Sequence, residues 1–279
     1  MKFGVFHFPT AYSIDVAELA VALEQRGLES LFVCEHTHIP TSRKSPFPGG
    51  GELPKRYIHA HDPFISLAFA AAATKNLTLG TGICLIPQRD PIVTAKTIAS
   101  LDVMSNGRVE FGIGGGWNVE EMNNHGVEYK TRFKQMREHT EAMKAMWTEE
   151  EASYNGEFVN FDPIWSYPKP ARKPHPPVLL GGETDYTLKR VVEYCDGWIP
   201  RGGRGFEPKA SMQRLRDMAE KHGRDANEIT TTLFRGPTEQ EHIDACRENG
   251  VTRVLYDVPD TGRDEALRTL DDIAALMAK

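Results

Sequence analysis

The pair Glu35 and His36 is the part of this sequence best suited to chemistry. It follows an apolar run at residues 30–34 and precedes residues 37–62, a long aperiodic segment rich in Pro, Gly and His. An imidazole titrates near neutral pH, so a positioned histidine can exchange protons under working conditions. Long loops of this kind are commonly lids or binding loops. His36 is therefore the candidate proton-transfer residue, with a hydrogen-bonded structural histidine as the alternative.

Two glycine clusters could bring the backbone close to a ligand. Residues 114–116 are all glycine and precede Asn118, while Gly181 and Gly182 precede Thr184. Glycine permits close approach of the backbone, and the free amides of a helix N-terminus suit a phosphate group. Thr184 is placed to cap the helix that follows. Either cluster alone could be a tight turn, but the two together favour a phosphate-bearing ligand.

Other polar residues form weaker patterns. Four histidines invite a metal-site interpretation of the amidohydrolase kind: His36, His38, His59 and His61. That kind of site also needs histidines after the fifth and sixth predicted strands, where Gly181 and Arg201 stand instead. A metal-dependent hydrolase therefore stays an alternative, and we assign no metal ligand. Arg201, Arg204 and Arg235 could hold an anionic group by bidentate contacts, or could be solvated loop residues.

Apolar periodicity places these candidates at the ends of strands. Short apolar runs alternate with amphipathic stretches, which predicts repeated βα units and a parallel sheet. The predicted strands are residues 2–8, 30–34, 77–85, 108–113, 178–180, 197–199, 229–233 and 253–258. The predicted helices are residues 14–26, 63–73, 92–104, 131–147, 187–194, 209–222, 239–249 and 264–277. Eight units in 279 residues favour an α/β fold, a closed (β/α)8 barrel, over a doubly wound open sheet.

One segment interrupts the alternation of strands and helices. Residues 153–161 alternate in polarity around Asn155 and Gly156, which is typical of a β-hairpin. We expect this hairpin to be an insertion between the fourth and fifth barrel strands, within a single domain that spans residues 1–279. Active sites of such barrels lie at the carboxyl ends of the strands, where the candidate residues stand.

Composition narrows the class of partner. The chain has 33 basic and 39 acidic residues and a net charge of −6, which argues against a nucleic-acid partner. No apolar run approaches about 18 residues, so no membrane partner is expected. The N-terminus does not resemble a signal peptide, and the four cysteines are scattered without a C-x-x-C pair, as expected of reduced thiols. We expect a cytoplasmic protein that acts on a small molecule.

Several motifs resemble those of the luciferase-like monooxygenases. Residues 79–87 (LGTGICLIP) and then 89–91 (RDP) resemble the third-strand signature of that family. The next motifs of the resemblance are residues 99–108 (ASLDVMSNGR), 111–118 (FGIGGGWN), 177–182 (PVLLGG) and 195–198 (CDGW). The resemblance runs from Met1 to about Trp198 and continues more weakly to the end of the chain.

The resemblance implies a cofactor at the carboxyl face of the barrel, either FMN or the deazaflavin F420. Many members have a non-proline cis peptide in the third strand behind the cofactor ring, here between Gly82 and Ile83. Glu183 departs from the serine common among the phosphate contacts, so its carboxylate should turn away and leave only its amide. The implied cofactor-binding residues are Phe6, Thr81, Gly82, Ile83, Gly114, Gly115, Gly116, Trp117, Asn118, Gly181, Gly182, Glu183, Thr184 and Arg201.

The sequence of the turn after the fourth strand distinguishes family members that use FMN from those that use F420. Luciferases carry an arginine there that meets the FMN phosphate, and Gly115 stands in its place. Trp117 and Asn118 are more typical of the F420-dependent branch, so the resemblance favours F420, with FMN as the alternative. Trp117 also stands where F420-dependent sugar-phosphate dehydrogenases have an acidic residue, which argues against a sugar phosphate as substrate.

The resemblance implies an oxidoreductase that moves a hydride between F420 and a small organic substrate. His36 would exchange the accompanying proton, and Glu35 would orient His36. An FMN-dependent monooxygenase that uses O2 and a partner flavin reductase is one alternative, and a non-catalytic flavin-binding barrel is another. Members of this family are commonly dimers, so we expect a homodimer.

Overall fold

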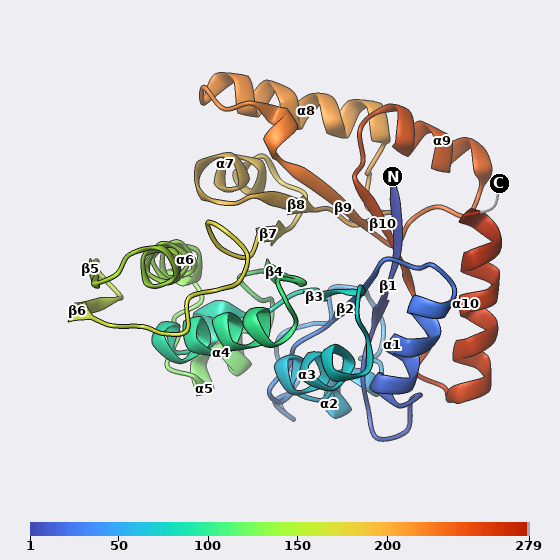
Figure 1. Ribbon diagram of the computed structural model, residues 1–279, viewed down its shortest axis with the longest axis horizontal. Coiled ribbons are helices and arrows are strands. Elements are labelled where there is room, and N and C mark those ends of the chain that lie inside the picture. Colours follow the sequence, from blue (N-terminus) through green and yellow to red (C-terminus); the bar gives the residue numbers. More distant parts are fainter. Residues whose placement is uncertain (278–279) are drawn as a thin grey trace.

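Eight parallel strands close into a barrel with helices around it (Figure 1). The computed structural model describes residues 1–277, so the last two residues of the predicted domain lie outside it. The strands are β1 (Lys2–His7), β2 (Ser30–Val33), β3 (Thr78–Thr81), β4 (Val109–Ile113), β7 (Val178–Gly181), β8 (Gly197–Ile199), β9 (Thr230–Phe234) and β10 (Arg253–Asp257). Their order around the barrel is β1-β10-β9-β8-β7-β4-β3-β2. The predicted (β/α)8 barrel is confirmed, and the open sheet is wrong.

All the predicted helices are present, with ends shifted by at most two residues. They are α1 (Val16–Gln25), α3 (Pro63–Ala73), α4 (Pro91–Met104), α6 (Arg132–Thr148), α7 (Asp185–Tyr194), α8 (Pro208–Lys221), α9 (Gln240–Glu248) and α10 (Arg263–Met277). Side-chain caps fix several starts, as where Asp62 accepts hydrogen bonds from the amides of Phe64 and Ile65. Two short helices lie in the loops above the barrel, α2 (Arg56–His59) and α5 (Val119–Asn124).

The third strand is shorter than expected. Regular pairing ends at Thr81, and the next peptide bond, between Gly82 and Ile83, is cis as the family resemblance implies. Cys84 rejoins the sheet only through an isolated bridge to Ile113. The chain then leaves the barrel at its carboxyl face, so this segment forms part of the wall above the barrel.

The predicted hairpin is confirmed with its boundaries moved by a few residues. β5 (Ala152–Asn155) and β6 (Asn160–Ile164) pair antiparallel in the connection between β4 and β7. The hairpin lies outside the barrel beside α6 (Figure 1). There Glu138 accepts hydrogen bonds from the amides of Phe158 at 2.7 Å and Val159 at 3.0 Å.

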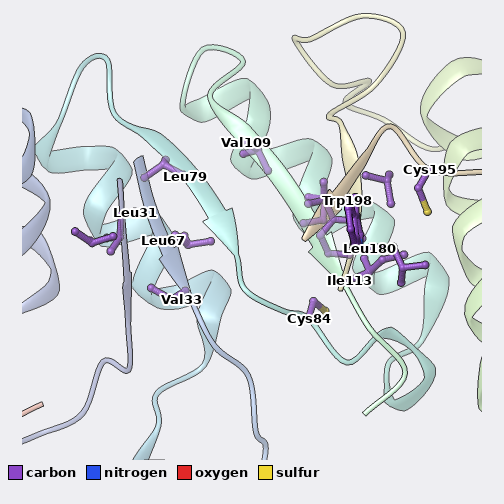
Figure 2. Close-up of a cluster of buried hydrophobic side chains, with 14 of the residues drawn as sticks. Leu31, Val33, Leu67, Leu79, Cys84, Val109, Ile113, Leu180, Cys195 and Trp198 are labelled. Carbon is purple, nitrogen blue, oxygen red and sulfur yellow. The ribbon is translucent and has the colours of Figure 1, made fainter. Parts of the chain in front are cut away.

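Apolar side chains pack on both sides of the barrel wall. A large cluster lies between the strands and the helices, and Figure 2 shows part of it, including Leu79, Leu180 and Trp198. A smaller cluster fills the barrel interior with side chains from several strands, among them Phe6 of β1, Phe32 of β2 and Leu179 of β7. Gly80 is needed beside Phe32, because a Cβ there would lie 2.3 Å from its ring. The interior is therefore solid below the carboxyl face.

A buried ion pair crosses the amino end of the barrel. Arg253, 2% exposed at the start of β10, donates to both carboxylate oxygens of Glu110 in β4 at 2.7 and 2.9 Å. Its Nε donates to Glu29 at 2.8 Å. Since β10 and β4 lie on opposite sides of the barrel, Arg253 ties the two sides together.

The predicted thiol state also agrees with the structure. All four cysteines are buried and free of disulfides. Within residues 1–277, none of the helices has the length and apolar character needed to cross a membrane. The cytoplasmic location stays a prediction.

Candidate functional site

A cavity of about 590 Å³ opens at the carboxyl face of the barrel. Its lining comes from the ends of β1, β2, β3, β4, β7, β8, β9 and β10, and from the first turns of α6 and α7. Loop residues 37–62 contribute Tyr57, as expected of a segment near a binding site. Binding pockets for small ligands commonly have this size and mostly apolar lining. This cavity is therefore the candidate active site.

His36 lies at the cavity wall in a defined hydrogen bond. Its Nδ1 is 2.8 Å from Oε2 of Glu121, whose side chain is completely buried. Glu121 belongs to α5. Asn118 caps the start of this helix, because its side-chain oxygen accepts a hydrogen bond from the backbone amide of Glu121 at 3.1 Å. With Nδ1 held by a carboxylate, Nε2 of His36 is the ring atom left to exchange a proton with a ligand.

The expectation that Glu35 orients His36 is wrong. Although the two residues are adjacent, the buried carboxylate of Glu35 accepts a hydrogen bond from the amide of Leu85 at 2.6 Å and pairs with Arg89. Successive residues of an extended chain point in opposite directions, which sends the two side chains to different partners. Glu35 instead anchors the segment that follows the Gly82–Ile83 peptide.

Aromatic rings surround the imidazole. The ring centroid of His36 lies 5.4 Å from that of Tyr57 and 5.8 Å from that of Trp117. Phe47, from the same loop as Tyr57, packs against both of those rings. Burial raises the pKa of Tyr57, so its hydroxyl stays protonated near neutral pH. The space beside His36 thus suits an apolar or planar organic group.

One wall of the cavity contains Gly114 and Gly115, and neighbouring side chains pack close to their backbone. A Cβ on Gly114 would lie 1.8 Å from Cδ1 of Ile83, and a Cβ on Gly115 would lie 2.8 Å from the ring of Phe133. Larger residues at these positions would therefore collide with Ile83 and Phe133, two side chains that also line the cavity. Gly181 and Ile83 continue the same wall. A flat ring system is the kind of group that such a wall accommodates.

Most predicted cofactor contacts line this cavity, and two do not. Thr81 is buried with its hydroxyl donated to the carbonyl of Gly112 at 2.7 Å, and Asn118 is buried as the cap of α5. The structure brings the other predicted residues together here: Phe6, Gly82, Ile83, Gly114, Gly115, Gly116, Trp117, Gly181, Gly182, Glu183, Thr184 and Arg201. Thr81 and Asn118 support the site from behind without lining it.

The N-terminus of α7 forms one end of the cavity. Thr184 caps the helix through a hydrogen bond from the amide of Thr187, as predicted. Gly182 has a φ of +134°, a conformation that favours glycine, and its carbonyl accepts a hydrogen bond from the indole of Trp198 at 2.6 Å. The carboxylate of Glu183 turns to Arg201, whose NH2 donates to it at 2.8 Å. Arg201 thus lines the cavity as a partner of Glu183, and its contact with the cofactor stays a prediction.

Two other arginines at this end have no acidic partner among residues 1–277. The guanidinium groups of Arg132 and Arg190 lie over the ring of Phe133, at 4.2 and 4.1 Å from its centroid. The Nε of Arg132 is buried without a hydrogen-bond partner among the described residues. Burial, and then the charge of Arg190, lower the pKa of Arg132. An anionic group of a ligand would satisfy this donor and relieve the repulsion.

The remaining candidates lie apart from the cavity or in other contacts. His38 is 2.8 Å from the side-chain amide of Asn124, and His59 packs against Tyr12. Among the described residues, no three His, Cys, Asp or Glu side chains are grouped as metal ligands. Arg235 lines the cavity 3.6 Å from Asp257, whereas Arg204 bonds to the carbonyl of Pro48.

Several functional candidates were not found from the sequence. Glu121 had a weak signal, since it stands three residues after a helix-capping asparagine, but its contact with His36 spans 85 positions. Arg132 and Arg190 lie on helices whose periodicity gives no reason to single them out. The residues present fit an elongated cofactor with a planar ring at the glycine wall and an anionic group near Arg132.

The comparisons with known proteins identify the family of this chain. The model of the luciferase-like monooxygenase family matches residues 1–273, so the chain belongs to that family of oxidoreductases. An uncharacterized protein of Mycobacterium tuberculosis is 40% identical over 284 residues, which cover 100% of this chain and 99% of that protein.

Two further proteins resemble the chain, one in sequence and one in fold. The F420-dependent glucose-6-phosphate dehydrogenase of Kineococcus radiotolerans is 28% identical over 228 residues, which are 78% of this chain and 62% of that enzyme. The chain thus spans less than two thirds of that relative. A monooxygenase from Streptomyces bottropensis has the same fold, with a TM-score of 0.81 and 20% identity over 100% of this chain and 99% of that chain.

Proposed function

We propose that this protein is an F420-dependent oxidoreductase that moves a hydride to or from a small organic substrate. The observation that carries the proposal is the His36–Glu121 pair, with Nδ1 2.8 Å from the carboxylate, on the wall of a cavity backed by glycine. A hydride transfer that interconverts a carbonyl and an alcohol moves the hydride at carbon and a proton at the substrate oxygen, and His36 is placed to give or take that proton.

The chain's own residues have separable tasks in this proposal. F420, when bound, supplies the two-electron hydride chemistry. Gly114, Gly115 and Ile83 would form the surface under its ring, and Arg132 would meet its phosphate. Glu121 holds the His36 ring so that Nε2 gives or takes the proton, while Tyr57 and Trp117 exclude water from it.

The competing proposal is an FMN-dependent monooxygenase with O2 and a separate flavin reductase. The family to which the chain belongs is named for monooxygenases, and both cofactors are phosphate-bearing. The family resemblance places an FMN-binding arginine in the turn after β4. Gly115 stands at that position in this chain, which supports F420 over FMN. The F420-dependent relative at 28% identity supports the same choice.

A homodimer belongs to the same proposal. Helix α3 exposes several apolar side chains, with Ile65 at 62% and Phe69 at 61% exposed. The neighbouring α4 adds Val93 at 64% and Met104 at 82%. A surface helix of a monomer normally shows polar residues on its outer face. A second copy of the chain would cover this face.

The deciding experiment is a parallel titration of the purified protein with F420 and with FMN, followed by fluorescence. We expect binding of F420 at micromolar or lower concentration and weaker binding of FMN. Preference for FMN would shift the proposal to the monooxygenase, and binding of neither would reopen the metal-hydrolase alternative.

His36→Ala tests the assigned proton-transfer role. We expect F420 affinity to change less than about threefold, because the imidazole is not among the groups that hold the cofactor. Turnover of F420 with a substrate found by screening alcohols and ketones should fall by about 100-fold or more, the usual contribution of a general acid or base. Unchanged turnover would remove His36 from the reaction.

A further inference from the structure

A second, smaller cavity adjoins the candidate active site. It measures about 230 Å³ and is lined by residues of α6 and α7. The two cavities share Phe133, Tyr186 and Arg190 in their linings. The two cavities are therefore neighbours, and Phe133, Tyr186 and Arg190 stand between them.

Positive charge dominates the small cavity. Its lining has four cationic side chains, Lys134, Arg137, Lys189 and Arg190, and one carboxylate, that of Glu193. Glu193 is shared between Arg137 at 3.2 Å and Lys189 at 3.7 Å. Two further carboxylates approach from outside the lining, Glu141 to Arg137 at 2.8 Å and Glu157 to Lys134 at 3.7 Å. Arg190 has no acidic partner among the described residues.

Unsatisfied buried donors lie along the same path. The Nε of Arg132, at the edge of the large cavity, has no hydrogen-bond partner among residues 1–277. The same holds for the hydroxyl of Tyr194, a residue of the small cavity that is only 7% exposed. Buried donors of this kind normally have an acceptor, so their grouping beside unpaired cations indicates that an anionic ligand completes them.

We propose that the small cavity binds the carboxylate-bearing tail of F420. This inference rests on the proposed function and names the part of the cofactor that each cavity holds. FMN ends at its phosphate, whereas in F420 the phosphate is a diester that continues into a chain of glutamates. Arg132 and Arg190 meet the phosphodiester, and Lys134, Lys189 and Arg137 meet the glutamate carboxylates.

The tail contacts have a definite electrostatic character. The side chains of Lys134, Lys189 and Arg137 are 71%, 54% and 49% exposed, so each contact with a carboxylate is weak and easily screened. The tail should therefore raise affinity at low salt, with an effect that grows with the number of glutamates and fades at high salt. A deazaflavin riboside, which lacks phosphate and tail, should not respond to these residues.

The experiment measures dissociation constants by fluorescence at low and high salt. The ligands are F420 with a long tail, F420 with one glutamate, the deazaflavin riboside and FMN. The test variant is Lys134→Glu with Lys189→Glu. Its control is Lys209→Glu with Lys221→Glu, which makes the same change of net charge on exposed positions of α8. Thermal unfolding of both variants checks that they fold.

The expected result is that long-tailed F420 binds more tightly than the one-glutamate form to the wild type, and that the test variant weakens its binding about tenfold at low salt. The control and the riboside should change by less than about twofold. Equal affinity for long and short tails, or an unchanged affinity in the test variant, would overturn the tail site while leaving the proposed function in place. Binding of FMN in preference to every deazaflavin would overturn both.

Discussion

At the scale of single residues, the hydrogen bond between Glu121 and His36 gives Glu121 a specific role, which is to hold the imidazole in place. Glu121 touches the imidazole and not the cavity, so we regard it as a positioning residue. Its second oxygen, Oε1, is buried without a partner among the described residues. A buried carboxylate needs hydrogen-bond partners, and the His36 ring is the side chain that the described residues place against it.

Glu121→Gln keeps the size and the hydrogen-bonding capacity of the side chain and removes its charge. We expect turnover to fall by about tenfold or more with little change in the KM for the substrate, because the imidazole loses the carboxylate that orients it while the cavity lining stays the same. The control is Glu120→Gln on the same helix, whose carboxylate contacts the Ser45 amide at 3.2 Å and not His36. Identical turnover in both variants would refute the positioning role.

His7 should make stability depend on pH. It is completely buried in β1, and burial lowers its pKa from 6.5 to about 4. The unfolded chain takes up a proton at this residue as the pH falls below about 6.5, while the folded chain does not until about pH 4. Stability is therefore lost as the pH falls through that window, by up to about 3 kcal/mol.

Urea unfolding between pH 7.5 and pH 5 measures this effect. In His7→Asn the fall in the free energy of unfolding should be smaller than in the wild type. It should not vanish, because burial also lowers the pKa values of His139 and His175. His242→Asn is the control, since that side chain is 64% exposed. If the free energy of unfolding of His7→Asn fell with pH as steeply as that of the wild type, His7 would not be a source of the pH dependence.

At the scale of elements, the buried ion pair between Arg253 of β10 and Glu110 of β4 should contribute strongly to stability. Burial raises the pKa of Glu29, but the hydrogen bonds and charge of Arg253 outweigh it and bring that pKa to about 2. Arg253→Met would leave the carboxylate of Glu110 without its cation and Glu29 with Lys2 alone, which should lower the free energy of unfolding by about 3–5 kcal/mol. Arg263→Met, at a side chain 58% exposed, should cost less than about 1 kcal/mol. Equal losses in urea unfolding would show that the crossing pair contributes little.

Strands and helices were predictable because their patterns are local. The alternation of apolar runs and amphipathic stretches is readable residue by residue, and the hairpin follows from Asn155 and Gly156. For the site, the sequence predicted the location at the carboxyl ends of the strands but not the contacts between the side chains. Glu35 and His36 are adjacent in sequence, yet their partners, Arg89 and Glu121, are brought to them by other loops. Arg132 and Arg190 meet over Phe133 only after α6 and α7 have packed.

At the scale of the whole molecule, the apolar face of α3 predicts self-association. Ile65→Glu with Phe69→Glu should convert the expected dimer to a monomer, because two charges would be buried in the contact. Sedimentation over a range of concentrations measures this change. Trp165→Gln, which alters another apolar side chain with 75% exposure, should leave the assembly unchanged. A wild type that stays monomeric at every concentration would contradict the homodimer.

The ion pair of Arg253 lies at the opposite end of the barrel from the cavity. The groups that hold the strands together at the amino end are thus different from those that bind ligands at the carboxyl end. This separation matters for engineering of the enzyme. Loop residues such as Tyr57, Trp117 and Arg235 can be randomised to alter substrate preference while the amino end preserves folding, so libraries at the cavity mouth should retain a high fraction of soluble variants.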